Sequence, residues 1–226
     1  MTTHPRQSSS VMTSTPAISA PNQERVDREI DALLASLPDP GGLTAAERRG
    51  IIARYTAVLE GNFIYWMTAS DLAVASDEAH AIIHDNLLEE VRDNHPGMLR
   101  RFAMAAHAVP TDTDAFAVHR QLQAVRHFVS RLSAPKLVLM MAFFEGFICK
   151  FMPYLADLAA RQGSTEMEYT DVHGVVDVGH TQGLFRALDA ELTLLPSPLP
   201  PSSPLLEGVE VLRTLLQAVV LPGVAA

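Results

Sequence analysis

The stretch DVHGVVDVGH, Asp171 to His180, places His173, Asp177 and His180 at positions i, i+4 and i+7. On an α-helix this spacing puts the three side chains on one narrow stripe. Two imidazoles and a carboxylate in such a stripe have two interpretations: half of a metal site, or an ordinary polar helix face. The residues around the stretch bear on which of these holds.

The composition of the chain describes an acidic protein with ample material for a core. Of its 226 residues 48% are hydrophobic, and the formal net charge is -9. This charge gives no electrostatic support for a nucleic-acid partner. Cys149 is the only cysteine, so disulfides within the chain are excluded and a reducing cytoplasm is the expected location.

Two segments bear on targeting and on membranes. Residues 1–23 contain no apolar core segment, so we expect a disordered leader rather than a signal peptide. The longest apolar run, LVLMMAFF, ends at Glu145 and is far shorter than the roughly 20 residues that span a bilayer. We therefore expect a soluble protein with no membrane partner.

Helical patterns fill the chain, and we find no alternating runs closed by Asn-Gly or Asp-Gly turns. The fold class predicted is all-α, with one helical domain over 24–194, a proline-rich connector over 195–204, and a C-terminal helix and tail over 205–226. The predicted helices cover 25–37, 44–75, 77–92, 95–107, 115–132, 134–161, a segment from after 166 to about 194, and 205–220.

Carboxylates on apolar faces are the natural partners for the quoted stripe, because an unpaired buried charge costs several kcal/mol. Glu145 lies in LMMAFFEGFICKF, which is apolar nearly all round, so almost any orientation buries it. A protonated glutamate bonded to a buried polar group is the alternative. Glu60 shares its helix side with Phe63, Ile64 and Met67 and should also face the core, unless it lies at the rim of that face.

The segment NLLEEVRDNHP adds two adjacent acids and a histidine. Glu90 falls on the apolar stripe of its helix, whereas Glu89 falls on another side and is kept as the alternative ligand. His95, just before a proline at a helix start, could turn inward or could serve only in the turn. The candidate metal ligands are Glu60, Glu90, His95, Glu145, His173, Asp177 and His180. Mixed nitrogen and oxygen donors of this kind suit iron or manganese better than a structural zinc.

The order of these residues resembles that of the haem-oxygenase-like di-iron oxidases and oxygenases. No Glu-x-x-His pair occurs in the chain, which argues against a ferritin-like bundle. The resemblance rests on an early helix glutamate, NLLEEVRDNHPGMLRRF, FFEGF and HGVVDVGH. Residue by residue it implies that the seven candidates bind two Fe(II) ions, with O2 as co-substrate, in a haem-oxygenase-like bundle of about seven core helices. A histidine-ligated haem stays open, but it would not explain four core-facing acids.

The same resemblance implies a reaction class. Members oxidise small aliphatic substrates, and the texture of two segments is similar to the branch with the azetidine amino-acid synthase of polyoxin biosynthesis. We expect C–H activation of a small amino acid, by desaturation or cyclisation, in a natural-product pathway, with an external electron donor and a homodimer both open. The alternatives are a non-catalytic helical binding protein and a metal-free enzyme of the same fold.

The substrate pocket is expected to be lined by apolar residues near the ligands. The candidates are Phe63, Met141, Phe144 and Leu184, with plain core packing as the alternative. A zwitterionic substrate also needs a cation, but Arg186 and Lys150, the nearest in sequence, point away from their ligand neighbours. The pair His80 and His84 and the arginines of MLRRF are interpreted as solvated helix faces.

Overall fold

The computed structural model describes residues 19–197 and 204–221, and over these residues it contains nine α-helices and no strand. The prediction of an all-α fold is confirmed. The helices are α1 (Ala20–Ala35), α2 (Ala45–Leu59), α3 (Asn62–Ala73), α4 (Asp77–Arg92), α5 (His95–Ala105), α6 (Asp112–Val129), α7 (Ala134–Ala160), α8 (Glu168–Thr193) and α9 (Glu207–Val220).

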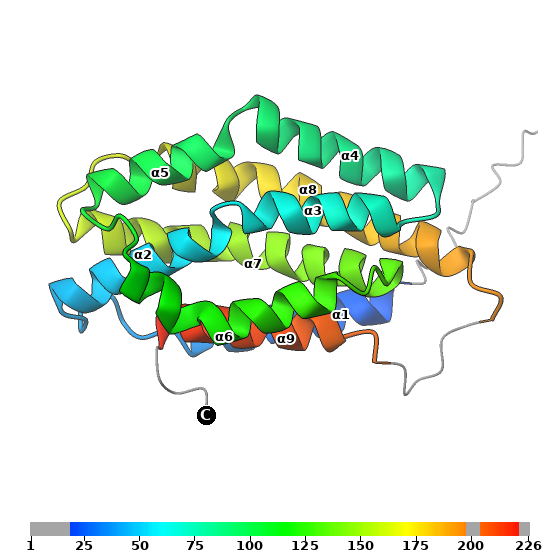
Figure 1. Ribbon diagram of the computed structural model, residues 1–226, viewed down its shortest axis with the longest axis horizontal. Coiled ribbons are helices and arrows are strands. Elements are labelled where there is room, and N and C mark those ends of the chain that lie inside the picture. Colours follow the sequence, from blue (N-terminus) through cyan, green and yellow to red (C-terminus); the bar gives the residue numbers. More distant parts are fainter. Residues whose placement is uncertain (1–18, 198–203, 222–226) are drawn as a thin grey trace, which may run out of the picture.

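Most of the helices run along the long axis of the molecule, with α7 in the middle (Figure 1). α7 packs against α8 most extensively and also contacts α1, α2, α3 and α9. α4 and α5 cover α8 from the far side, and α6 packs on α2 and α9. The side chains of α8 that face α4, α5 and α7 are therefore enclosed on all sides.

The sequence of α7 explains its central position. It is apolar on nearly every face, and Leu137 to Glu145 is buried without interruption. Within the described residues, α7 alone is long and apolar enough to cross a membrane by length and composition. However, 78% of its most apolar window is buried inside the fold, and the core helix of a folded domain passes the same test.

The segment 44–75 was predicted as one helix, and this prediction is wrong. The structure divides it into α2 and α3, which are separated by Glu60 and Gly61. Gly61 has a φ of 75°, a left-handed conformation that glycine adopts without steric penalty. The predicted start is confirmed, because Thr44 forms a capping box with Glu47.

A sharp turn joins α4 to α5. Asn94 adopts a left-handed conformation with a φ of 57°, which asparagine tolerates better than most residues. The next residue, His95, begins α5, with Pro96 in its first turn as predicted. This reversal brings the end of α4 and the start of α5 close together.

The chain ends fit the predicted organisation in part. α1 begins at Ala20, five residues before the predicted start, so 20–23 of the predicted leader are helical. The rest of the leader, except Ser19, lies outside the described residues, as does 198–203 of the predicted connector. α9 packs on α6 and α7 as part of the bundle.

Candidate metal centre

The quoted stripe faces the interior of the bundle. His173 is 6% exposed, Asp177 is fully buried and His180 is 5% exposed. Val175 and Val178, on the other side of α8, are exposed to solvent. The helix thus turns its polar residues inward and its valines outward, the reverse of an ordinary amphipathic surface helix.

A first triad forms around His173. Glu90 at the end of α4, His95 at the start of α5 and His173 each offer a ligand atom, and these atoms lie within 4.8 Å of one another. Nδ1 of His95 is 2.8 Å from Oε1 of Glu90, and the rings of His95 and His173 are 4.5 Å apart between centroids. Nδ1–H of His173 donates to the backbone carbonyl of Tyr169 at 2.7 Å. That bond fixes the ring and leaves Nε2 free to bind a metal, an arrangement typical of metal-binding histidines.

A second triad lies beside the first. It joins Glu145 of α7 to Asp177 and His180 of α8, again with ligand atoms within 4.8 Å of one another. Nδ1 of His180 is 3.7 Å from Oδ1 of Asp177 and 3.8 Å from Oε2 of Glu145. All three side chains are buried.

The structure gives different positions to the two adjacent acids of α4. Glu90 is 2% exposed and belongs to the first triad, so it points inward as expected. Glu89 lies at the edge with 36% of its side chain exposed, and its Oε2 is 3.3 Å from Nε2 of His180. Glu89 therefore adds a carboxylate to the rim of the second triad rather than replacing Glu90.

The polar atoms of the two triads lack the partners that buried groups normally have. Such atoms are rarely left without a hydrogen bond in a folded protein, and a site for a bound ion is one of the recognised explanations. Here Oε1 of Glu145, both carboxylate oxygens of Asp177 and Nδ1 of His180 are buried without a hydrogen bond, and Oε1 of Glu90 and Nδ1 of His95 have only each other, at 2.8 Å. The donor set and its unsatisfied atoms fit divalent metal ions.

In the metal-free protein the pKa values of the triad residues are shifted so that the site holds protons. Burial, together with the charges of Glu145 and Glu90, raises the pKa of Asp177 to about 11. Burial also raises the pKa of Glu145. For His180, burial lowers the pKa, but the carboxylates of Glu145, Glu89 and Glu90 outweigh this effect and raise it to about 9. Protons are thus held at this site above neutral pH, where metal cations would displace them.

The expectation that Glu60 faces the core is wrong. It ends α2, 43% of its side chain is exposed, and it forms an ion pair with Arg100 at 2.6 Å. The cause is the break at Gly61, because the predicted position of Glu60 assumed a continuous helix. Glu60 belongs to neither triad, and its role as a ligand stays a prediction.

A cavity of about 520 Å³, counting its open mouth, joins Glu60 to the triads. Glu90, His95, Glu145, His173 and Asp177 all line it. Of the four residues expected in its apolar wall, Phe63 and Phe144 do line the cavity. Met141 and Leu184 are fully buried and are not among the lining residues.

Several lining residues were not predicted from the sequence. The apolar ones are Leu59, Ile64, Leu99 and Ile148, and Arg100 lies at the mouth. Tyr169 also lines the cavity, and its hydroxyl hydrogen-bonds to that of Tyr55 at 2.8 Å. The sequence held a signal for Tyr169, because it lies four residues before His173 on the same helix face.

The chain matches no model of a known protein family, no curated protein and no solved structure. Its function therefore has to be inferred from the site itself.

Proposed function

We propose that this protein is a non-haem di-iron oxidase or oxygenase with a haem-oxygenase-like bundle, acting on a C–H bond of a small aliphatic amino acid. One observation carries the proposal. Six buried side chains from four helices meet in two adjacent triads, and each residue of the second triad has a buried polar atom without a hydrogen bond. A helical protein that binds no cation has no physical reason to bury three carboxylates in this way.

The charges and donors of the site favour two divalent iron ions. Glu90, Glu145 and Asp177 supply three negative charges, and Glu89 at the rim supplies a fourth, which together balance two divalent cations. Imidazole and carboxylate donors without thiolate suit ferrous iron. When bound, ferrous ions would supply electrons to dioxygen. The protein's residues fix the donors and exclude water around them.

The cavity supports a small substrate with a charged head and an apolar tail. Phe63 and Phe144 form part of an apolar wall, whereas Glu60 and Arg100 lie at the mouth. A free amino acid carries a carboxylate that Arg100 can bind and an ammonium group that Glu60 can bind. Such a substrate would replace the Glu60–Arg100 ion pair and place its side chain against the apolar wall, toward the triads.

The electron balance of this reaction requires a donor. Desaturation removes two hydrogens from adjacent carbons, and ring closure removes one hydrogen from carbon and one from nitrogen, so each yields two electrons and two protons. Full reduction of O2 to two water molecules takes four electrons and four protons. An external reductant therefore supplies the other two electrons, and solvent supplies the other two protons.

Metal binding is tested by anaerobic Fe(II) titration. We expect two Fe(II) ions per wild-type chain, one fewer or much weaker binding in His173→Ala, and wild-type behaviour in the control His119→Ala, a surface histidine of α6. Unchanged iron uptake in His173→Ala would refute the di-iron proposal. Circular dichroism of each variant excludes unfolding as the cause.

Catalysis is tested separately by oxygen consumption and mass spectrometry of candidate aliphatic amino acids. We expect the iron-loaded protein, supplied with a reductant, to yield products two mass units lighter than the substrate. Two bound irons with no oxygen consumption on any amino acid would leave a metal-binding protein and would refute the assigned reaction.

A further inference from the structure

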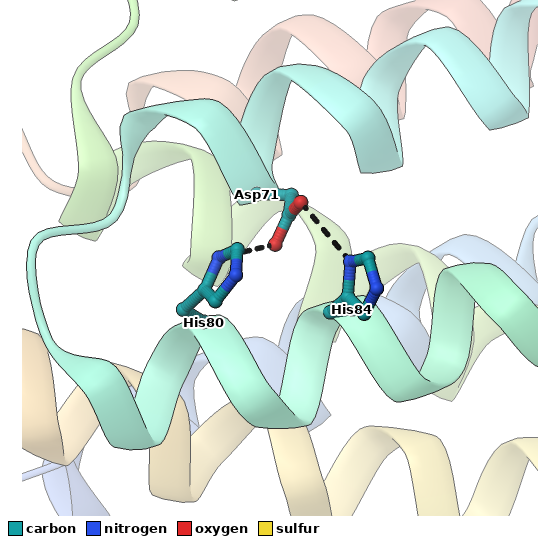
Figure 2. A group of neighbouring side chains, drawn as sticks. All are labelled: Asp71, His80 and His84. Carbon is teal, nitrogen blue, oxygen red and sulfur yellow. Dashed lines mark ion pairs between the residues drawn. The ribbon is translucent and has the colours of Figure 1, made fainter.

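A third cluster of metal-binding residues lies near the turn between α3 and α4, away from the buried triads. Asp71 of α3 faces His80 and His84, which are one turn apart on α4 (Figure 2). Nδ1 of His80 is 2.8 Å from Oδ1 of Asp71, and Nδ1 of His84 is 3.5 Å from Oδ2. The predicted solvated face is confirmed, since both histidines are exposed, but an acid does lie close to them because Asp71 comes from the neighbouring helix.

The environment of the cluster differs on its two sides. The side chains of His80 and His84 are 56% and 46% exposed, whereas that of Asp71 is 13% exposed. Oδ1 of Asp71 is inaccessible to solvent and has no hydrogen bond, although Nδ1 of His80 is close to it. The two imidazole rings are stacked, with centroids 5.5 Å apart. A mostly buried carboxylate thus faces two half-exposed imidazole rings.

The backbone that carries the cluster is well anchored. The buried carboxylate of Glu191 on α8 accepts hydrogen bonds from the backbone N–H groups of Ala75 and Ser76, at 2.8 and 2.7 Å. Ser76 caps the start of α4 with its side chain. The hydrogen bonds from Glu191 and the cap at Ser76 fix the turn between α3 and α4. The backbones of Asp71 and the two histidines are therefore positioned before any ligand binds.

We propose that Asp71, His80 and His84 form a separate surface site for a divalent transition metal ion such as zinc. Two histidines at i and i+4 with a carboxylate from a second element supply three protein ligands, and solvent supplies the fourth. Zinc bonds of about 2.1 Å in tetrahedral geometry separate nitrogen and oxygen ligands by roughly 3.4 Å. One ligand atom from each of the three residues already lies within 4.8 Å of the others, so small rotations of the two half-exposed rings bring the three atoms to this separation.

The site is chemically distinct from the buried centre. It has two imidazoles and one carboxylate and is open to solvent, whereas the buried centre has three of each and is enclosed. An open nitrogen-rich site binds zinc and copper more tightly than ferrous iron. A metal here would join α3 to α4 in the first half of α4, between about 9 and 15 Å along the helix from Glu90, as set by His84 and His80. It would hold in place the helix that carries Glu89 and Glu90.

Zinc binding to untagged protein tests this site by equilibrium dialysis and by thermal unfolding. The variants are Asp71→Asn and the double variant His80→Ala/His84→Ala. We expect each to bind one zinc fewer per chain than the wild type, or to bind it at least roughly tenfold more weakly. Zinc should raise the unfolding midpoint of the wild type by more than that of either variant. The comparison is a difference between chains, so it holds whatever the buried triads bind.

The matched control is His119→Ala/His127→Ala, which removes two exposed histidines from α6. It should bind as much zinc as the wild type. Equal losses in the control would indicate non-specific binding to surface imidazoles and would overturn the proposal. Unchanged zinc binding in the α4 double variant, with only a lower stability of the metal-free protein, would show that the cluster is an ion pair and nothing more. Neither result would affect iron uptake by the buried triads.

Discussion

Asp177 offers the sharpest test of the electrostatics at the metal centre. Its carboxyl is fully buried, and its pKa is raised from an ordinary value of 3.8 to about 11. In the metal-free protein at pH 7 it is therefore protonated when folded and ionised when unfolded. Protonating it on folding costs about 4 kcal/mol, from about 1.4 kcal/mol for each pH unit between 3.8 and 7. The figure depends only on the folded pKa lying above 7.

The substitution Asp177→Asn removes this cost because an amide does not titrate. We expect the metal-free variant to be more stable than the wild type at pH 7, by up to about 4 kcal/mol, or roughly 8 to 16 °C in unfolding midpoint. Above pH 3.8 the folded wild type keeps a proton on Asp177 that the unfolded chain loses. The free energy of unfolding of the wild type therefore falls, relative to that of the variant, as the pH rises. The difference between the two proteins should therefore shrink toward pH 4, and iron should stabilise the wild type far more than the variant.

The assay is thermal unfolding of chelator-treated protein from pH 4 to pH 8, with and without anaerobic Fe(II). The control is Asp171→Asn, an exposed acid on the same helix, which should behave like the wild type. A metal-free Asp177→Asn protein that is less stable than the wild type, with an unchanged pH dependence, would refute the reasoning. It would show that Asp177 is ionised in the fold and paired with His180.

Three further predictions follow from the site and the helix break. Arg100→Gln should raise KM for a carboxylate-bearing substrate roughly ten- to a hundredfold, as for the loss of a hydrogen bond to a charged group, with little change in kcat; steady-state kinetics measure this, and the control Arg101→Gln should match the wild type. Gly61→Ala should lower the free energy of unfolding by about 1 to 2 kcal/mol, because alanine is strained at a φ of 75°. An added Cβ meets no atom within 4 Å, so a steric clash does not contribute. An unchanged free energy of unfolding in urea would contradict the left-handed turn. Iron affinity should rise with pH through pH 9, because binding displaces the protons of His180, whose pKa is raised to about 9, and of Asp177, whose pKa is raised to about 11. Calorimetry in buffers of different ionisation enthalpy should detect this proton release, and binding without proton release would contradict it.

The ligands on long, unbroken helices could be placed from the sequence. His173, Asp177 and His180 share a stripe because α8 is regular throughout, and Glu145 is buried because α7 is apolar all round. Glu90 was selected over Glu89 by the same periodic argument, and its burial confirms its inward position. Local spacing is sufficient in these cases because a regular helix fixes the direction of each side chain.

Positions next to a break in a helix could not be placed this way. The pattern of 44–75 reads as one helix, and Gly61 alone does not reveal its positive φ, because glycine also occurs within helices. Because the chain turns at Gly61, Glu60 lies outside the helix that carries Phe63 and Ile64, although all three line the cavity. Glu60 consequently moves from the expected core to the mouth of the cavity, where it pairs with Arg100.

Contacts between helices are a second kind of information that local spacing lacks. His80 and His84 were interpreted as a solvated face with no inward acid near them, yet Asp71 reaches them from α3. The turn at residues 74–76 makes this contact, since it folds the end of α3 back along the start of α4. Asp71 precedes His80 by only nine residues, so the partner was close in sequence but required the geometry of the turn. The buried triads join residues that are far apart in the sequence, such as Glu145 and Asp177. They could still be predicted because their acids lie on apolar helix faces, a signal that the surface cluster lacks. An acid on an apolar face predicts a partner, because an unpaired buried charge is costly, whereas an exposed histidine pair predicts none until the neighbouring helix is placed.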